Sequence, residues 1–139
     1  MENNCIFCKI IKKELPSYEI YENEFFKVIL DRFPGNIGHM ILVSKTHAAD
    51  IFSLPDKYVR EAMPLAKKAA VALKIATGCE GVNILQNNGE AAGQTVSHFH
   101  IHILPRFKDD GVDMTWRHLE QTDAEFIGTA GRIKEVFTI

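Results

Sequence analysis

The sequence predicts an α+β fold, with a five-stranded antiparallel sheet, one long helix and a short N-terminal helix. Two observations lead to this prediction. Short strand-like segments follow one another with brief polar turns, and residues 55–76 have helical spacing with start and stop signals. A chain of 139 residues without repeats or low-complexity tracts suits one domain, expected to span 1–139.

The first half of the chain supplies a short helix and three strands. The helix is expected over 6–13, ahead of Pro16. Strand-like stretches rich in branched and aromatic residues then occupy 17–21, 25–30 and 39–43. Short, turn-rich connections between successive strands favour antiparallel pairing.

The long helix over 55–76 has recognisable ends. Pro55 suits a first helical position and Gly78 suits a C-terminal cap, whereas Pro64 is expected to kink or split the helix. The second half is too broadly apolar to cover only one face of a sheet. We therefore expect a second packing partner, most economically a second copy of the chain. Burial within one chain is the alternative.

The second half of the chain adds two strands and a final helix. Strands are expected over 81–85 and 95–104, the latter stopped by Pro105, with a loop over 86–94 between them. Thr122 and Glu125 then have capping-box spacing. Apolar residues follow at helical spacing, although Gly128 and Gly131 weaken the pattern: they are Phe126, Ala130, Ile133 and Phe137.

Composition excludes several classes of function. With 16 Lys and Arg against 18 Asp and Glu, the net charge of −2 argues against nucleic acid or membrane as a partner. No apolar run reaches the length of a membrane span, and the N-terminal residues show no secretory leader. Three cysteines make no disulfide framework, so we expect a reducing, cytoplasmic compartment.

The most informative segment contains His98, His100 and His102. Strand alternation places these histidines on one face and Phe99 and Ile101, with Ile103, on the other. Imidazoles in such a row can hold a metal or act on an anion. On one strand they would span about 13 Å, too far for a single metal, so the anion interpretation is favoured. The loop segments 87–89 and 93–95 could direct backbone N–H groups at a phosphate.

Residues 98–104 match the alternating signature His-φ-His-φ-His-φ-φ, where φ is apolar, and the chain resembles the histidine triad (HIT) family. Segments 5–11 and 87–94, Asp31 and Gly38-His39 agree with the family in the same order. The resemblance covers 5–106, leaves 107–139 as a C-terminal extension, and is strongest to the bacterial Hint-like branch.

The resemblance implies a HIT-like fold that pairs into a two-fold dimer. It also implies hydrolysis at the α-phosphorus of a purine nucleotide conjugate of the adenosine type. His100 falls on the family's nucleophile, His102 and His39 fall on phosphate contacts, and Thr95 falls near the leaving group. Asp31 falls on the ribose contact, although turn formation is an equal alternative for it. The remaining nucleotide-binding positions implied are Asn87 and Gly93 beside the phosphate and Ile6, Phe7, Ile10, Ile29 and Arg32 around the base.

The pair Cys5-x-x-Cys8 is half of a structural zinc site. In the branch that the chain resembles, the remaining ligands correspond to His47 and His98. The alternative is a free thiol pair at a helix start. No catalytic metal is expected, and Cys79 is interpreted as an unpaired structural residue. His118 and Trp116 are interpreted as exposed loop residues, with a contact to a partner's site as the alternative.

Two other functions remain open from the sequence. One is a purine-nucleotide-binding regulatory protein that turns over weakly or not at all. The other is a zinc-dependent hydrolase that uses the histidine face as its metal site.

Overall fold

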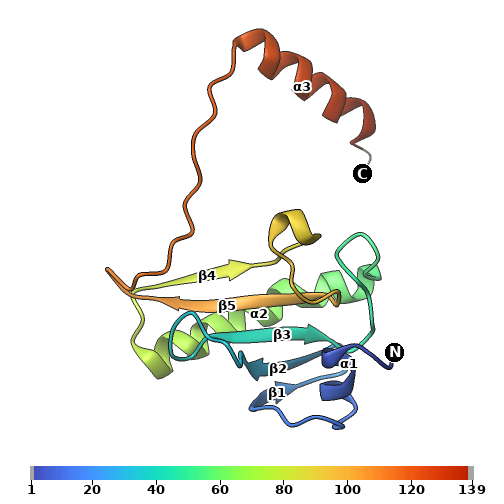
Figure 1. The fold of residues 1–139 in the computed structure, drawn as a ribbon, viewed down its shortest axis with the longest axis vertical. Helices are drawn as coiled ribbons and strands as arrows, with labels where there is room; N and C mark the ends of the chain where they lie inside the picture. The colour runs from blue at the N-terminus through green and yellow to red at the C-terminus, as the bar shows by residue number, and fades with distance from the viewer. Residues whose placement is uncertain (1, 138–139) are drawn as a thin grey trace.

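Five antiparallel strands form one sheet in the order β1-β2-β3-β5-β4 in the computed structural model, which describes residues 2–137 (Figure 1). This confirms the predicted α+β fold. The strands are β1 (Glu19–Glu22), β2 (Phe26–Leu30), β3 (Met40–Ser44), β4 (Gly81–Leu85) and β5 (His100–Arg106).

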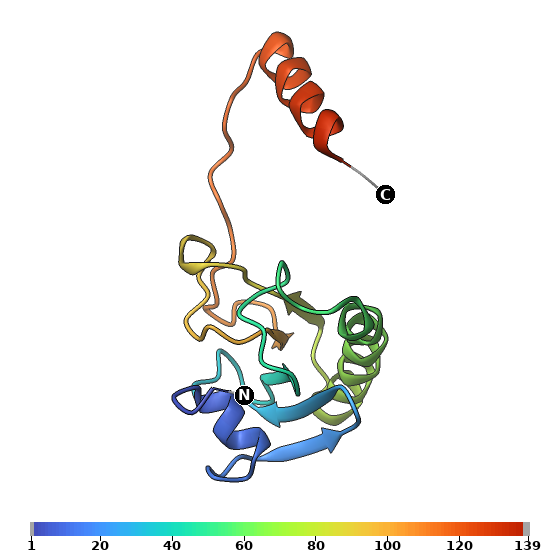
Figure 2. The same cartoon turned by 90° about the vertical axis from the view of Figure 1, so that its right-hand side faces the viewer.

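The helices lie on both sides of this sheet. α2 (Asp56–Thr77) covers one face, and the short α1 (Ile6–Ile11) lies against the other (Figure 2). A single 3-10 turn, η1 (Glu90–Ala92), interrupts the loop between β4 and β5, and α3 (Asp123–Val136) follows the sheet. None of the helices in the described range is long and apolar enough to cross a bilayer.

Strand alternation divides the core into two layers, as predicted for the histidine segment. Phe99, Ile101 and Ile103 pack with Leu65 and Leu73 of α2 in the larger cluster. On the opposite face, apolar residues of α1 meet those of β2 and β3 in a smaller cluster: Phe7, Ile10, Ile29, Ile41 and Val43. His100 and His102 therefore share the α1 side of the sheet.

The predicted ends of the long helix are close to those observed. Gly78 caps α2 with a φ of 67°, a left-handed conformation that glycine adopts without a Cβ penalty. Pro55 is the N-cap rather than the first helical residue. Pro64 does not split the helix, because α2 continues through it. Pro64 is exposed, so the ring and the carbonyl left without its helical hydrogen bond can face water.

The strand predicted over 95–104 was wrong at both ends, since β5 begins at His100 and continues to Arg106. Residues 95–99 are not paired as a strand, because the pairing of β3 with β5 ends at His100 and that of β4 with β5 ends at His102. Pro105 is tolerated because β3 pairing ends at Ile103. Its carbonyl instead accepts a hydrogen bond from the Asn36 side chain at 2.9 Å.

The observed ends of other helices and strands differ from the predicted ends by one or two residues. The first helix ends at Ile11 rather than at residue 13, because Lys13 adopts a φ of 63°. β1 begins at Glu19 rather than at residue 17. β4 has the predicted bounds, and the capping box at Thr122 is present.

Beyond β5 the chain leaves the sheet. Residues 111–121 run as an extended segment that places α3 well away from the sheet, on the side of β4 (Figures 1 and 2). We call residues 111–137 the C-terminal arm.

Candidate active site and metal centre

A cavity of about 480 Å³ opens on the α1 side of the sheet. This volume lies within the range of sites for small ligands. Its wall is mostly apolar, with a polar end formed by Asp31, Thr95, His100 and His102. The sequence-predicted base-pocket residues all line this cavity: Ile6, Phe7, Ile10, Ile29 and Arg32.

His100 projects from the first position of β5 into the polar end of the cavity. Its Nδ1 lies 2.6 Å from the carbonyl oxygen of His98, which can only accept, so Nδ1 carries the hydrogen. Burial lowers the pKa of His100, so the ring is neutral at pH 7. The neutral ring then has its lone pair on Nε2, the arrangement required of a nucleophile.

His102, two residues on, has the opposite arrangement. Its Nδ1 lies 2.9 Å from Nε2 of His39 on the neighbouring strand. On the opposite side of the His39 ring, Nδ1 accepts a hydrogen bond from the backbone N–H of Gly35 at 3.0 Å. His39 must therefore carry its hydrogen on Nε2 and donate it to His102 Nδ1. This leaves His102 with an Nε2–H donor.

Burial is also the main reason that these rings are neutral. It lowers the pKa of His102 to about 4, and the neighbouring imidazoles of His100 and His39 add to the shift. Burial likewise lowers the pKa of His39, against an opposing effect of Asp31. The site therefore holds three neutral imidazoles with fixed tautomers at pH 7.

Asp31 serves the turn and the cavity at once. Its Oδ1 accepts the backbone N–H of Phe33 at 2.9 Å, as the turn interpretation requires. Its Oδ2 lies 3.5 Å from His39 Nε2 and 3.6 Å from His102 Nδ1. The two interpretations from sequence are thus compatible, because each uses a different oxygen.

The loop between β4 and β5 is organised by Gln94, a residue that the sequence analysis did not single out. Its side chain donates to the carbonyl oxygens of Ala49 (2.6 Å) and Val96 (3.0 Å) and accepts from Gly89 N (2.7 Å). Thr95, next in the chain, lines the cavity. Asn87 and Gly93 lie side by side: a Cβ on Gly93 would be 3.6 Å from Asn87 Nδ2. Neither is in the cavity wall.

The sequence did not predict the other residues that line the cavity. They come from the loop after α1, from β2 and β3, and from the segments around them: Leu15, Pro16, Ser17, Tyr18, Leu30, Phe33, Ile41 and Val96. Tyr18 is tied to Arg32, whose Nη1 lies 3.4 Å from its hydroxyl. The apolar Leu15-Pro16 pair in an otherwise polar connection was the available signal.

The two cysteines meet two histidines next to the cavity. His98 Nδ1 lies 3.3 Å from Cys5 Sγ, 3.6 Å from Cys8 Sγ and 3.2 Å from His47 Nδ1. His47 Nδ1 also lies 3.4 Å from Cys8 Sγ. Tetrahedral zinc with bonds of about 2.0–2.3 Å would space its ligands by roughly 3.3–3.8 Å. The four donor atoms therefore fit a zinc ion.

The surroundings of these ligands support the same conclusion. The Nε2 of His98 lies 2.7 Å from the carbonyl oxygen of Ser44, so Nε2–H donates there and the lone pair on Nδ1 faces the cysteines. Burial lowers the pKa of His98 to about 4, which keeps it neutral as a metal ligand must be. Without a cation, burial raises the pKa of the Cys8 thiol. A bound zinc would reverse that preference.

A second group, Asp31, His39 and His102, also brings three donor atoms together. It does not fit a metal. Ligation through His39 Nε2 would move the hydrogen to Nδ1, where it would oppose the N–H of Gly35. The geometry instead describes a chain of hydrogen bonds that orients His102.

Comparison with known proteins identifies the class. Residues 12–109 match the HIT domain, and the chain belongs to the HIT family. It is 40% identical over 125 residues to an adenosine 5'-monophosphoramidase of Saccharomyces cerevisiae, covering 89% of this chain and 76% of that protein.

Two solved structures extend the comparison. A HIT family protein from Bacillus subtilis superposes with a TM-score of 0.92 at 32% identity, covering 99% of both chains. A zinc-bound histidine triad family protein from Mycobacterium smegmatis superposes with a TM-score of 0.76 at 35% identity, covering 82% of this chain and 83% of that one.

Proposed function

We propose that this protein hydrolyses purine nucleotide conjugates of the adenosine type at the α-phosphorus through a covalent nucleotidyl-His100 intermediate. The observation that carries the proposal is the opposite tautomers of two adjacent imidazoles. His100 offers a lone pair on Nε2, whereas His102 offers an Nε2–H. A nucleophile and a hydrogen-bond donor thus lie side by side at the polar end of a nucleotide-sized cavity. The similarity to an adenosine 5'-monophosphoramidase supports the nucleotide class.

In the first half-reaction, His100 Nε2 attacks the α-phosphorus and the bond from phosphorus to the leaving group breaks. An amine leaving group departs with a proton, which the Thr95 hydroxyl at the cavity wall can relay from solvent. The ring becomes positively charged once it carries phosphorus on Nε2 and hydrogen on Nδ1. The His98 carbonyl, 2.6 Å away, stabilises that charge.

In the second half-reaction, water attacks phosphorus and the bond from His100 to phosphorus breaks. The products are the nucleoside monophosphate and neutral His100. In both steps negative charge accumulates on the non-bridging oxygens. The Nε2–H of His102 is available to stabilise this charge, with His39 holding His102 in that tautomer.

The other parts of the site have supporting roles in this proposal. The carboxylate of Asp31 accepts the ribose hydroxyls. Asn87 and Gly93 lie outside the cavity wall, in the loop that leads to Thr95, and their assignment to the phosphate side rests on the HIT resemblance. The apolar wall around Ile6, Phe7, Ile10, Ile29 and Arg32 holds the purine. Cys5, Cys8, His47 and His98 hold a structural zinc that would fix the His98 carbonyl behind His100.

We also propose that the working unit is a homodimer. The exposed apolar residues of α2, Val59, Met63, Val71 and Ile75, support it.

The test is to trap the intermediate. Wild-type protein quenched in base during turnover of an adenosine phosphoramidate should carry one nucleotidyl group on His100, located by peptide mass spectrometry under non-acidic conditions because acid hydrolyses the phosphorus–nitrogen bond. His100→Asn and His100→Ala should form no adduct and lose turnover. Near-wild-type turnover by either variant would exclude the mechanism. Tight AMP binding by the wild type without adduct or turnover would instead support a regulatory nucleotide-binding protein.

A parallel panel of AMP and GMP conjugates with amine and phosphate leaving groups tests the substrate class. Faster turnover of the AMP phosphoramidates is expected.

A further inference from the structure

The tip of the turn between β2 and β3, residues 32–38, has little apolar packing. Phe33 and Ile37 are 88% and 89% exposed. A backbone hydrogen bond from His39 N to the Asn36 carbonyl oxygen, at 3.0 Å, closes the turn but ties it only to itself. The position of the tip over the sheet therefore depends on contacts made by its side chains.

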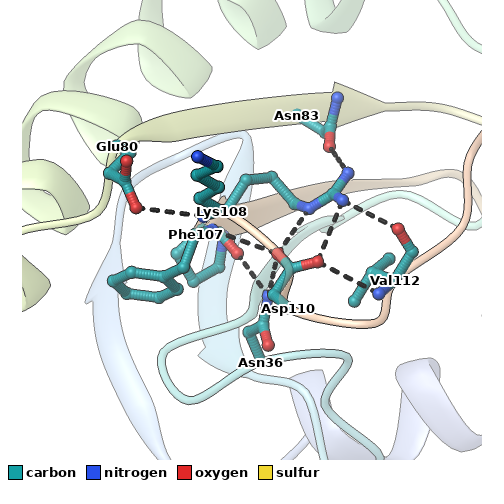
Figure 3. A network of polar contacts seen from close by, with 9 residues as sticks. Asn36, Glu80, Asn83, Phe107, Lys108, Asp110 and Val112 are labelled. Atoms are coloured by element: carbon teal, nitrogen blue, oxygen red, sulfur yellow. Dashed lines mark hydrogen bonds and ion pairs between the residues drawn. The ribbon is translucent and has the colours of Figure 1, made fainter.

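Asn36 supplies these contacts (Figure 3). Its Nδ2 donates to the Pro105 carbonyl oxygen at 2.9 Å and to Asp110 Oδ2 at 2.8 Å. A carbonyl and a carboxylate can only accept, so the nitrogen of the amide, with its two hydrogens, must face them. Among the described residues, the other hydrogen bond from the tip to a distant part of the chain is a 3.4 Å contact between the exposed side chains of Arg32 and Tyr18.

Asp110 is a firmly held partner for Asn36. Its side chain is only 6% exposed, and its carboxylate also accepts hydrogen bonds from Arg106 Nε and Nη2 at 2.8 and 3.0 Å. The backbone N–H groups of Phe107 and Val112 donate to it at 3.0 Å. The Arg106 guanidinium and these two amides hold the pKa of the carboxyl well below its usual range, so it stays an acceptor at neutral pH.

The second partner of Asn36 belongs to the strand that carries His102. The pairing of β3 with β5 ends at Ile103, so the sheet offers the Pro105 carbonyl no donor from β3. The Asn36 amide takes the place of that donor. The tip is thereby attached to the same strand as the histidine that it serves.

The attached tip brings the Gly35 amide to His39. Gly35 directly precedes Asn36, and its N–H donates to His39 Nδ1 at 3.0 Å. Two tautomer arrangements satisfy the 2.9 Å hydrogen bond between His39 and His102. In one, His39 donates and His102 keeps a hydrogen on Nε2. In the other, His102 donates through Nδ1 and its Nε2 becomes an acceptor. Only the first is compatible with the N–H of Gly35.

We propose that Asn36 is a positioning residue for the reaction, because its side-chain amide holds the tip of the turn against the end of β5. The Gly35 amide is thereby kept at His39, and His102 keeps the Nε2–H that stabilises charge on the phosphate. This inference rests on the function proposed above. Asn36 does not line the cavity, so it acts on the nucleotide only through these residues. Without its amide, the reversed tautomers become populated.

Substitutions at Asn36 test this in the full-length protein. Asn36→Ala removes the donor, whereas Asn36→Asp keeps the shape but sets an acceptor against two acceptors. The matched control is Asn83→Ala, which removes a 2.8 Å contact to Arg106 from the same network without touching the turn. Both asparagines are half-buried, and neither belongs to a core cluster, so all three variants should fold.

Two readouts are needed. In substrate-free protein, long-range ¹H–¹⁵N NMR correlations should show both tautomers of His39 in the two Asn36 variants and the wild-type tautomer in Asn83→Ala. In turnover of an adenosine phosphoramidate, kcat should fall about tenfold for Asn36→Ala and further for Asn36→Asp, with KM within about threefold of wild type. Asn83→Ala should keep kcat within about twofold.

Three results would overturn the proposal and leave the nucleotidyl-His100 mechanism standing. They are wild-type kcat in both Asn36 variants, a loss of kcat with the wild-type tautomer of His39, and equal losses in Asn36→Ala and Asn83→Ala. The last would mean that the whole network, rather than the turn, supports turnover. Absence of nucleotidyl-His100 in the wild type would instead overturn the proposed function, and it is measured separately from the tautomers.

Discussion

The backbone N–H of Gly35 donates to Nδ1 of His39 over 3.0 Å, and this contact determines the hydrogen positions of the next two imidazole nitrogens. A main-chain amide cannot exchange its donor role, unlike a side chain that titrates. The turn can approach this closely because Gly35 has no Cβ, which would lie 3.1 Å from Leu104 Cδ1. The tautomer of His102 is thus determined by the Gly35 amide, which lies in a turn on the opposite side of the His39 ring.

The first prediction concerns tautomers. At pH 7.5, long-range ¹H–¹⁵N NMR correlations should identify His39 and His102 as neutral rings with the hydrogen on Nε2. The same spectra should identify His100 as a neutral ring with the hydrogen on Nδ1, because the His98 carbonyl lies 2.6 Å from it. The same tautomer at His100 and His102 would contradict the assigned roles of nucleophile and donor.

The second prediction separates the two contacts of His39. His39→Gln places an amide near the former Nε2 and can still donate to His102, whereas His39→Asn can reach only the former Nδ1 position. We expect kcat to fall about tenfold for Gln and a hundredfold or more for Asn, with similar KM values. Equal losses of kcat would show that the link from His39 to His102 does not matter for turnover.

The third prediction concerns Asp31. If its carboxylate accepts the ribose hydroxyls, wild-type kcat/KM should be about 10–100 times higher for a ribonucleoside conjugate than for its 2′-deoxy analogue. Asp31→Asn should reduce this ratio to a few-fold while it retains the turn contact to Phe33 N. The ratio is the readout because a purely structural loss would slow both substrates alike.

The fourth prediction concerns the metal centre. Purified protein should contain one zinc per chain, and Cys8→Ser should remove it and lower Tm by several degrees or more. Cys79→Ala is the matched control, since Cys79 is also buried but lies outside the four-donor cluster. Zinc retained by Cys8→Ser, or lost equally in Cys79→Ala, would exclude this assignment.

The histidine segment shows how far the sequence can predict this site. Alternation was sufficient to place Phe99, Ile101 and Ile103 on the face opposite the histidines, since successive side chains of a strand point to opposite faces. In the structure that face packs against α2. Alternation could not predict where β5 begins. That boundary depends on where β3 and β4 stop, and those strands are distant in the sequence.

The hydrogen-bond partners of the histidines could not be predicted from the sequence either. The sequence contained the Cys5-x-x-Cys8 spacing, but the Ser44 carbonyl that orients His98 and the Gly35 amide that orients His39 are backbone groups. Because every residue has backbone groups, the amino-acid pattern does not indicate which of them will bind a given histidine. Gln94 was missed for a related reason, because its three contacts depend on how the loop folds.

The last prediction concerns acid stability and follows from the buried His102. Its pKa is about 4 in the folded protein, against about 6.5 in an unfolded chain. The unfolded state therefore binds the proton more readily, and the folded state loses stability as pH falls from about 6.5 to about 4. Between pH 7.5 and pH 5, His102 should account for a loss of about 2 kcal/mol in the free energy of unfolding.

Urea unfolding of zinc-saturated protein at the two pH values measures this loss. His102→Asn removes the titrating ring, so its stability should decline by about 2 kcal/mol less than that of the wild type over the same interval. The exposed His118 in the C-terminal arm supplies the control, and His118→Asn should decline as the wild type does. If His102→Asn and the wild type lose stability equally, the ring is not buried in its neutral form, and the donor role assigned to its Nε2–H loses its basis.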